Sequence, residues 1–100
     1  MEKRTPHYDL ARIQIEVARL GAAAFTKAAL DGGRTMGLTT GEMLAVMAAL
    51  TRRNFYKAMT TYADHRIWQD VYHAVTPIHK EAYIKVTMRD LALVIQFKEK

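Results

Sequence analysis

Lysine and tyrosine side chains alternate with apolar residues near the end of this 100-residue chain. The segment 81–88 contains Tyr83 and Lys85 in this alternating pattern, and the segment 91–98 contains Lys98. Lysines attract phosphate groups and aromatic rings stack on exposed nucleobases, so these residue types are suited to binding RNA. Cleavage of RNA also needs a base for the proton of the 2′-hydroxyl, a cation for the phosphate and an acid for the leaving 5′-oxygen.

A lysine is able to fill two of these roles. It is a cation outright, and it becomes a base when burial or neighbouring positive charge lowers its pKa toward neutrality. Two lysines that converge on one face of a sheet help to produce such a shift. Tyr83 has the phenol of an acid or hydrogen-bond donor, whereas the amide of Gln69 only orients or polarises a bound group.

The segments 81–88 and 91–98 predict an antiparallel hairpin around Arg89-Asp90, although this residue pair is not a favoured turn. Pairing Met88 with Leu91 would bury one wholly apolar face, which carries Ile84, Val86, Met88, Leu91, Leu93, Ile95 and Phe97. The opposite face then carries Tyr83, Lys85, Thr87, Gln96 and Lys98. In this register Tyr83 lies opposite Gln96 with Lys98 as its diagonal neighbour. From the pattern alone, a solvated outer face without function is the more common explanation.

Helices are predicted in the first half of the chain. The first begins at Thr5 and Pro6, carries apolar residues at helical spacing and stops at Gly21. The segment 22–25 is a strand or a connector, and a short helix over 26–30 ends at Asp31-Gly32-Gly33. A capping box formed by Thr39 and Glu42 begins the last helix.

The second half changes to strand-forming segments rich in aromatic and β-branched residues, at 55–62, 67–75, 81–88 and 91–98. Along the first two, Lys57 shares a face with Phe55 and Met59, and Gln69 shares one with Val71 and His73. Helices followed by strands predict an α+β fold with an antiparallel sheet.

Composition narrows the classes of function. The chain is one domain's length, 1–100, with a formal charge of +5 that favours a polyanionic partner. It has no cysteine, which excludes a disulfide scaffold, a thiolate zinc site and a cysteine nucleophile. No apolar run is long enough to span a membrane and the start lacks the apolar stretch of a signal peptide, so we expect a cytoplasmic protein without a membrane partner.

The four histidines, at 7, 65, 73 and 79, raise the alternative of a histidine-pair or metal-dependent nuclease. No HxH or HExxH motif is present and the acidic residues are scattered, so we expect no metal and no cofactor. We place His7 in the first helix and treat each histidine, on spacing alone, as an ordinary surface or capping residue.

Three segments, MEKRTPH at the start, NFYKAMTTYADHRIWQDVY at 54–72 and QFKEK at 96–100, closely resemble the motility quorum-sensing regulator (MqsR) toxins of bacteria. The resemblance implies a RelE-like fold, with an antiparallel sheet packed on helices. It implies a ribosome-independent, metal-independent mRNA interferase that cuts single-stranded mRNA at GCU-type sites. It also implies an MqsA-type antitoxin, with a zinc-binding domain and a helix-turn-helix DNA-binding domain, through which alone the toxin would reach operator DNA.

By the same resemblance, the active-site positions of the family fall on Lys57, Gln69, Tyr83 and Lys98. Two of them, Tyr83 and Lys98, are positions that the hairpin pattern already places on one face. Contacts with RNA are expected from Tyr56, Met59, His73, Lys85 and Arg89. His73 stands where the family has an arginine, so a permanent cation is replaced by a mostly neutral group, and Arg89 is a candidate for the missing charge.

These observations favour an endoribonuclease toxin in which the 2′-hydroxyl attacks the phosphate, leaving a 2′,3′-cyclic phosphate and a 5′-hydroxyl. A non-catalytic RNA- or DNA-binding regulator uses the same charge and aromatic residues without needing any particular lysine. A protein-interaction domain with an acidic partner is a third interpretation. The placement of Lys57 and Gln69 relative to Tyr83 and Lys98 is decisive, because a site split between the two faces of the sheet would be no site.

Overall fold

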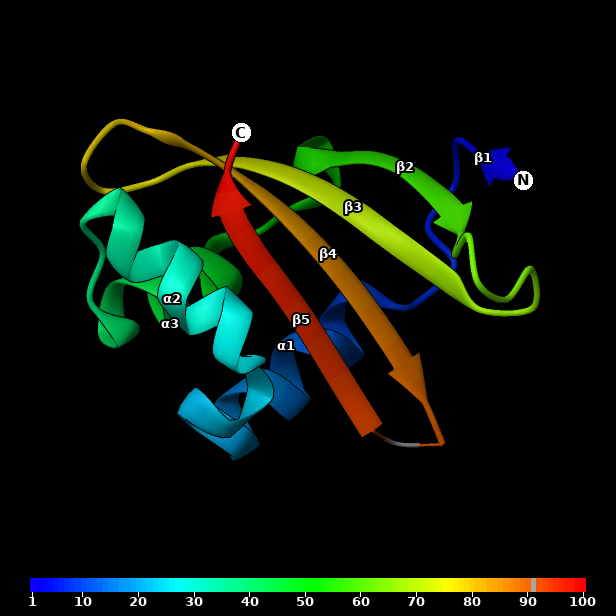
Figure 1. The fold of residues 1–100 in the computed structure, drawn as a ribbon, viewed down its shortest axis with the longest axis horizontal. Coiled ribbons are helices and arrows are strands. Elements are labelled where there is room, and N and C mark those ends of the chain that lie inside the picture. The colour runs from blue at the N-terminus through cyan, green and yellow to red at the C-terminus, as the bar shows by residue number, and fades with distance from the viewer. Residues whose placement is uncertain (91) are drawn as a thin grey trace.

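The computed structural model describes residues 1–90 and 92–100, and its centre is a five-stranded antiparallel sheet. The strands lie in chain order, with the bounds β1 (Glu2–Lys3), β2 (Phe55–Thr60), β3 (Trp68–Val75), β4 (Glu81–Arg89) and β5 (Ala92–Glu99). The helices α1 (Leu10–Leu20), α2 (Lys27–Met36) and α3 (Thr40–Ala49) pack against the sheet (Figure 1). The prediction of an α+β fold with helices packed on an antiparallel sheet is confirmed.

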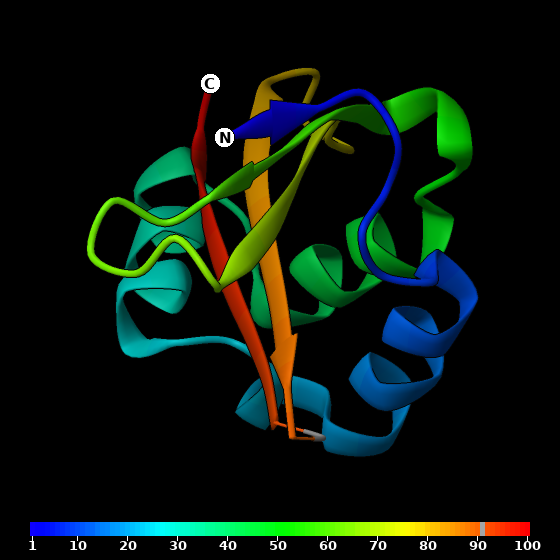
Figure 2. The same ribbon diagram turned by 90° about the vertical axis from the view of Figure 1, so that its right-hand side faces the viewer.

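One face of the sheet is covered by the helices and the other is not. The covered face presents the fully buried side chains of Ile84, Val86, Ile95 and Phe97 to the helices. Figure 2 shows α1 and α3 on the same side of the sheet, with α2 beside β5. Burial of this apolar face is the main source of stability for the fold. None of the described helices is long and apolar enough to cross a membrane.

The start of α1 differs from the prediction. The helix is capped by Asp9, whose carboxylate accepts a hydrogen bond from the amide of Ala11, and not by Thr5. The residues before it are held against the sheet by Asp70, a fully buried carboxylate on β3. Asp70 accepts hydrogen bonds from the amides of His7, at 2.9 and 3.1 Å, and Tyr8, at 2.9 Å. These long-range bonds keep His7 outside the helix, so its predicted place within the helix is wrong.

The predicted end of the second helix at Asp31-Gly32-Gly33 is also wrong. α2 runs through these residues to Met36 and ends at Gly37, which has a φ of 94°. Gly32 lies directly against β5, because a Cβ atom there would collide with the carbonyl oxygen of Phe97. The glycines therefore serve close packing within a helix that tertiary contacts stabilise, and their low helix propensity is overridden.

The segment before α2 is a connector and not a strand. It forms a short 3₁₀ helix, Gly21–Ala24, after which Phe25 makes an isolated parallel bridge to Ile95. The amide of Thr26 then donates to the carbonyl of Ile95, at 3.3 Å. These contacts fix the first turn of α2 at the β5 edge of the sheet.

The pairing of β4 with β5 corrects the predicted register. Met88 pairs with Leu93, and Tyr83 pairs directly with Lys98 instead of Gln96. Arg89 pairs with Ala92, so it belongs to β4 and the connection is displaced by one residue. The prediction for Leu91 falls outside the described residues. The pairing differs from the prediction by two residues. Because this is an even number, all the remaining predicted side chains of the hairpin stay on their predicted faces.

Two further features of the sheet were not predicted correctly. The strand β1 was missed, and Glu2 of this strand pairs with Met59. A bulge interrupts β2 between Phe55 and Lys57. Phe55 turns toward the covered face, where its ring meets that of Tyr72 edge-on at 5.7 Å, so it does not share a face with Lys57 as expected. The capping box of Thr39 and Glu42 at α3 is confirmed.

Candidate active site

The face of the sheet opposite the helices, called the open face below, carries all four predicted catalytic residues. The register places Lys57 of β2, Gln69 of β3, Tyr83 of β4 and Lys98 of β5 on this face. The open face also carries four of the predicted RNA contacts, which are Tyr56, Met59, His73 and Lys85. The four residues are therefore not divided between the two faces of the described sheet, which is the condition that a single site requires.

Tyr83 stands at the centre of a cluster of charged and aromatic groups. It pairs with Lys98 on one neighbouring strand and with His73 on the other. The amino group of Lys98 lies 5.5 Å from the centre of the Tyr83 ring, and that of Lys85 lies 5.8 Å from it. At these distances both ammonium groups are attracted to the ring. The phenol is consequently held next to two positive charges.

An aromatic ladder runs from β2 to β4 across the open face. The His73 ring stacks on Tyr56 at 4.5 Å between centroids and lies 5.4 Å from the ring of Tyr83. The bulge in β2 makes this possible, because it brings Tyr56 to the same face as Lys57. Burial, assisted by the positive charge of Lys100, lowers the pKa of His73, so its imidazole is neutral at pH 7.

Lys57 is held by an acidic partner that sequence reasoning missed. Its amino group lies 2.6 Å from the carboxylate of Glu2 on β1. The hydrogen bond from Lys57 to Glu2 raises the pKa of Lys57, so this side chain stays protonated. A base with a lowered pKa therefore does not describe Lys57, whose surroundings favour the protonated amine. The sequence spacing does not predict the role of Glu2, because its partner Lys57 lies on a strand far along the chain.

Gln69 and Arg89 lie away from this cluster. Gln69 pairs with Met59 and is four residues along β3 from His73, a separation of about 13 Å at about 3.3 Å per residue. It lines a cleft of about 560 Å³, together with Tyr62, His65 and Gln96. Arg89 is about 20 Å along β4 from Tyr83. It lines a separate depression with His7 and Arg66, so the structure does not bring Arg89 to the other predicted residues.

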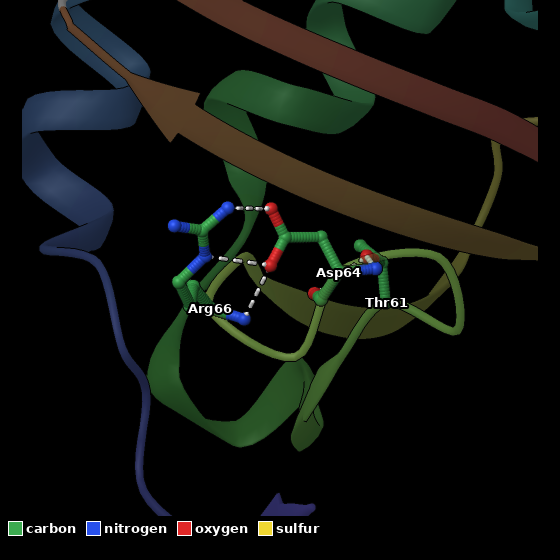
Figure 3. Close-up of polar contacts among 3 residues, drawn as sticks. All are labelled: Thr61, Asp64 and Arg66. Carbon is green, nitrogen blue, oxygen red and sulfur yellow. Dashed lines mark hydrogen bonds and ion pairs between the residues drawn. The ribbon is translucent and has the colours of Figure 1, made fainter.

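The loop between β2 and β3 borders the cleft around Gln69 and is held by its own polar contacts (Figure 3). Asp64 accepts hydrogen bonds from the guanidinium of Arg66 at 3.1 Å, and its amide donates to the hydroxyl of Thr61 at 3.0 Å. The bond from Arg66 lowers the pKa of Asp64 to about 2. The pair is thus charged above that pH, and the loop presents a fully exposed Tyr62 beside the open face.

Comparison with known proteins places the chain in a family. A model of the family described as "Motility quorum-sensing regulator, toxin of MqsA" matches residues 5–99. The chain belongs to this family of toxins. The mRNA interferase toxin MqsR of Escherichia coli (strain K12) is 40% identical to it over 100 residues, covering all of both chains. The predicted family and the predicted enzyme class, an endoribonuclease, are confirmed.

The open face of the toxin has the composition that such an enzyme needs. Three lysines, at 57, 85 and 98, face solvent around Tyr83, and Glu2 is the acidic residue paired with one of them. No group of three or more histidine, aspartate or glutamate side chains that could hold a metal ion occurs among residues 1–90 and 92–100. The groups that the described open face offers for chemistry are the lysine amines, the phenols of Tyr56 and Tyr83, the amides of Gln69 and Gln96, the imidazole of His73 and the carboxylate of Glu2.

Proposed function

We propose that the toxin cleaves single-stranded mRNA without a metal ion, by attack of the ribose 2′-oxygen on the adjacent phosphorus. A bond forms between the 2′-oxygen and phosphorus while the bond from phosphorus to the 5′-oxygen breaks. The 2′-hydroxyl proton goes to a base of the protein and an acid protonates the leaving 5′-oxygen. The products are a 2′,3′-cyclic phosphate and a 5′-hydroxyl. The observation that carries this proposal is the Tyr83–Lys98 pair on the same uncovered face as Lys57, whose pKa is raised by its hydrogen bond to Glu2.

Each catalytic residue has a role suited to its surroundings. Lys57 stabilises the negative charge that develops on the phosphate, since its bond to Glu2 keeps it protonated. Lys98 and Tyr83 are adjacent, and one of them takes the proton of the 2′-hydroxyl while the other protonates the leaving 5′-oxygen. Gln69, farther along the sheet, positions a neighbouring part of the RNA chain.

The remaining open-face residues bind the RNA strand. Tyr56 and His73 supply stacking surfaces, Met59 packs beside Gln69, and Lys85 attracts phosphate. Arg89 contacts a more distant part of the strand, given its separation from Tyr83. The length of the site along the sheet favours an extended, single-stranded substrate, and we propose GCU-type sites within it.

We further propose that the toxin acts in the cytoplasm and is neutralised by an MqsA-type antitoxin. The family description, which names MqsA, supports this partner. The antitoxin would carry the zinc-binding domain and the helix-turn-helix domain, so operator DNA is reached through it alone. Copurification of the coexpressed pair tests this assignment, and failure of the two chains to form a complex would contradict it.

The activity itself is tested with purified toxin and single-stranded RNA containing GCU sites, in the presence of EDTA. We expect cleavage with 5′-hydroxyl ends, and a rate at least about 100-fold lower for Lys98→Ala, the scale of a lost proton-transfer group. Lys80→Ala, which removes an exposed lysine from a loop away from this cluster, is the matched control and should cleave normally. Binding without cleavage would instead indicate a non-catalytic RNA-binding regulator, and undiminished cleavage by Lys98→Ala would remove Lys98 from the mechanism.

A further inference from the structure

A second feature of the open face lies at its β5 edge, where the sheet meets the first turn of α2. A cleft of about 300 Å³ opens there, walled on the sheet side by Tyr83, Lys85, Gln96 and Lys98. On the helix side it is walled by Thr26, Ala28 and Ala29. Its volume is at the lower end of the range for small-molecule sites, about 300–1,000 Å³, so it suits one small planar group rather than folded nucleic acid.

The helix wall of this cleft is held rigidly in place. The isolated bridge between Phe25 and Ile95, and the bond from the Thr26 amide to the Ile95 carbonyl, attach the start of α2 to β5. One turn farther along, the absence of a side chain at Gly32 lets α2 touch the backbone at Phe97. The cleft is therefore preformed, and a bound group does not have to be accommodated by ordering a loop.

The walls of the cleft combine apolar surface with a few polar groups. The exposed Ala28 and the ring of Tyr83 contribute apolar surface, whereas Ala29 and Phe97, which also line the cleft, are almost fully buried. The side-chain amide of Gln96 offers both donors and an acceptor to the cleft. The hydroxyl of Thr26 accepts from the amide of Ala29 at 3.0 Å and keeps its own proton for donation. A small cleft that combines apolar surface with hydrogen-bond donors and acceptors matches the chemistry of a nucleobase.

We propose that this cleft binds the nucleobase next to the scissile phosphate and that Gln96 selects the base by hydrogen bonding to its edge. The inference rests on the cleavage mechanism proposed above, because Tyr83 and Lys98 line the same cleft. A base held there keeps its ribose and phosphate within reach of that pair. Lys85 and Gln96 also line the cleft around Gln69, so the RNA strand continues from one cleft into the other.

The identity of residue 96 then decides which base is preferred. A glutamine amide donates one bond and accepts another, whereas a glutamate carboxylate only accepts. Guanine is the base whose pairing edge presents two neighbouring donors, N1–H and the N2 amino group. Replacing Gln96 with glutamate should therefore shift the preference toward guanine at this position. The added negative charge weakens binding of every RNA equally, so ratios between bases are the informative quantity.

The experiment measures kcat/KM on short single-stranded RNAs that differ only in the base on either side of the cleavage point. Gln96→Ala should reduce the ratio between the best and worst base by about tenfold, the scale of one lost base-reading contact. Gln96→Glu should raise the relative rate for guanine. Ala28→Leu, which narrows the cleft without altering Gln96, should also reduce the ratio. The matched control is Val94→Ala, on the same face of the same strand but outside both clefts, which should preserve the preference.

The outcomes separate this inference from the function on which it rests. If Gln96→Ala and Gln96→Glu cleave RNA with the base ratios of the unaltered toxin, the cleft is not a base site, while the nuclease proposal stands. If the unaltered toxin cleaves none of the RNAs, both proposals fall together. Thermal unfolding of each variant checks that a changed ratio comes from the cleft and not from loss of the fold.

Discussion

The two faces of one hairpin, β4–β5, differ completely in what surrounds them. On the covered face, Ile84 pairs with Phe97 and Val86 with Ile95, and all four side chains are buried under the helices. On the open face, Tyr83 pairs with Lys98 and Lys85 with Gln96, and only the first turn of α2 borders them, at the β5 edge. Neighbouring residues of a strand thus serve opposite purposes: one set stabilises the fold and the other is free for chemistry.

One exception on each face shows that partners, and not polarity alone, decide what a position tolerates. Asp70 is on the covered side and fully buried, and the amides of His7 and Tyr8 satisfy its carboxylate. Val71 is on the open side and is also fully buried. It pairs with Lys57 on one strand and Lys85 on the other, so the aliphatic stems of both lysines flank it on the open face. The lysines therefore have a packing role in addition to their charge.

The largest expected effect comes from removing the charge of Lys57 while keeping its length. Lys57→Met retains an apolar stem over Val71, so the fold should be unaffected. The rate of RNA cleavage should fall by about 100- to 1,000-fold, as when one preorganised electrostatic contact to a transition state is lost. Single-turnover cleavage and thermal unfolding measured on the same sample test this. Normal cleavage by Lys57→Met would place the phosphate elsewhere on the open face.

Ile95 and Val94 are adjacent, so they compare the two faces at nearly the same place. Ile95→Ala should lower the free energy of unfolding by about 2–5 kcal/mol, because it leaves a cavity beneath the helices. Val94→Ala, at a side chain that is 42% exposed, should have an effect of less than about 1 kcal/mol. Urea unfolding monitored by the fluorescence of Trp68 measures both. Equal losses would mean that the open face is packed as tightly as the covered one.

The faces of the strands were predictable because alternation of apolar and polar residues is a local signal. The register was not, since the predicted turn at Arg89-Asp90 lacks a strong turn signature, and in the structure Asp90 alone of that pair adopts a positive φ, of 51°. The faces survived this error because the shift was an even number of residues. The unpredicted bulge in β2 had a larger consequence. It places Phe55 on the covered face, opposite to the face that was predicted for it.

Features that depend on contacts between distant parts of the chain could not be predicted from the sequence. The role of Asp70 requires knowing that residues 7 and 8 return to β3, and the partner of Lys57 requires knowing that β1 pairs with β2. Within the candidate site, the hairpin pattern alone brought Tyr83 and Lys98 together. Lys57 and Gln69 came from the family resemblance, and the cleft beside Gln96 needed the placement of α2.

Gly32 tests the contact between α2 and β5, which supports both faces. Gly32→Ala would force a Cβ atom into the carbonyl oxygen of Phe97, a backbone atom that cannot move independently. We expect a loss of about 1–3 kcal/mol in the free energy of unfolding, typical of overpacking. Gly41→Ala is the matched control, since a Cβ there meets only the Thr39 hydroxyl at 3.9 Å within a helix. It should leave stability unchanged or raise it by about 0.4–1 kcal/mol.

The smallest expected effect concerns Glu2, the acidic neighbour of Lys57. RNA phosphate has to compete with this carboxylate for Lys57, so Glu2→Gln should lower KM by about two- to fivefold, the scale of an exposed ion pair. The hydrogen bond to Glu2 raises the pKa of Lys57, so its removal returns that pKa toward its ordinary value. A cation with a lower pKa loses its proton at lower pH, and the alkaline fall in cleavage should therefore begin at lower pH in Glu2→Gln than in the unaltered toxin. The gain in KM should disappear at high salt, where exposed charges are screened. An alkaline limb and a KM that match those of the unaltered toxin would mean that Lys57 is not the group whose charge the reaction needs.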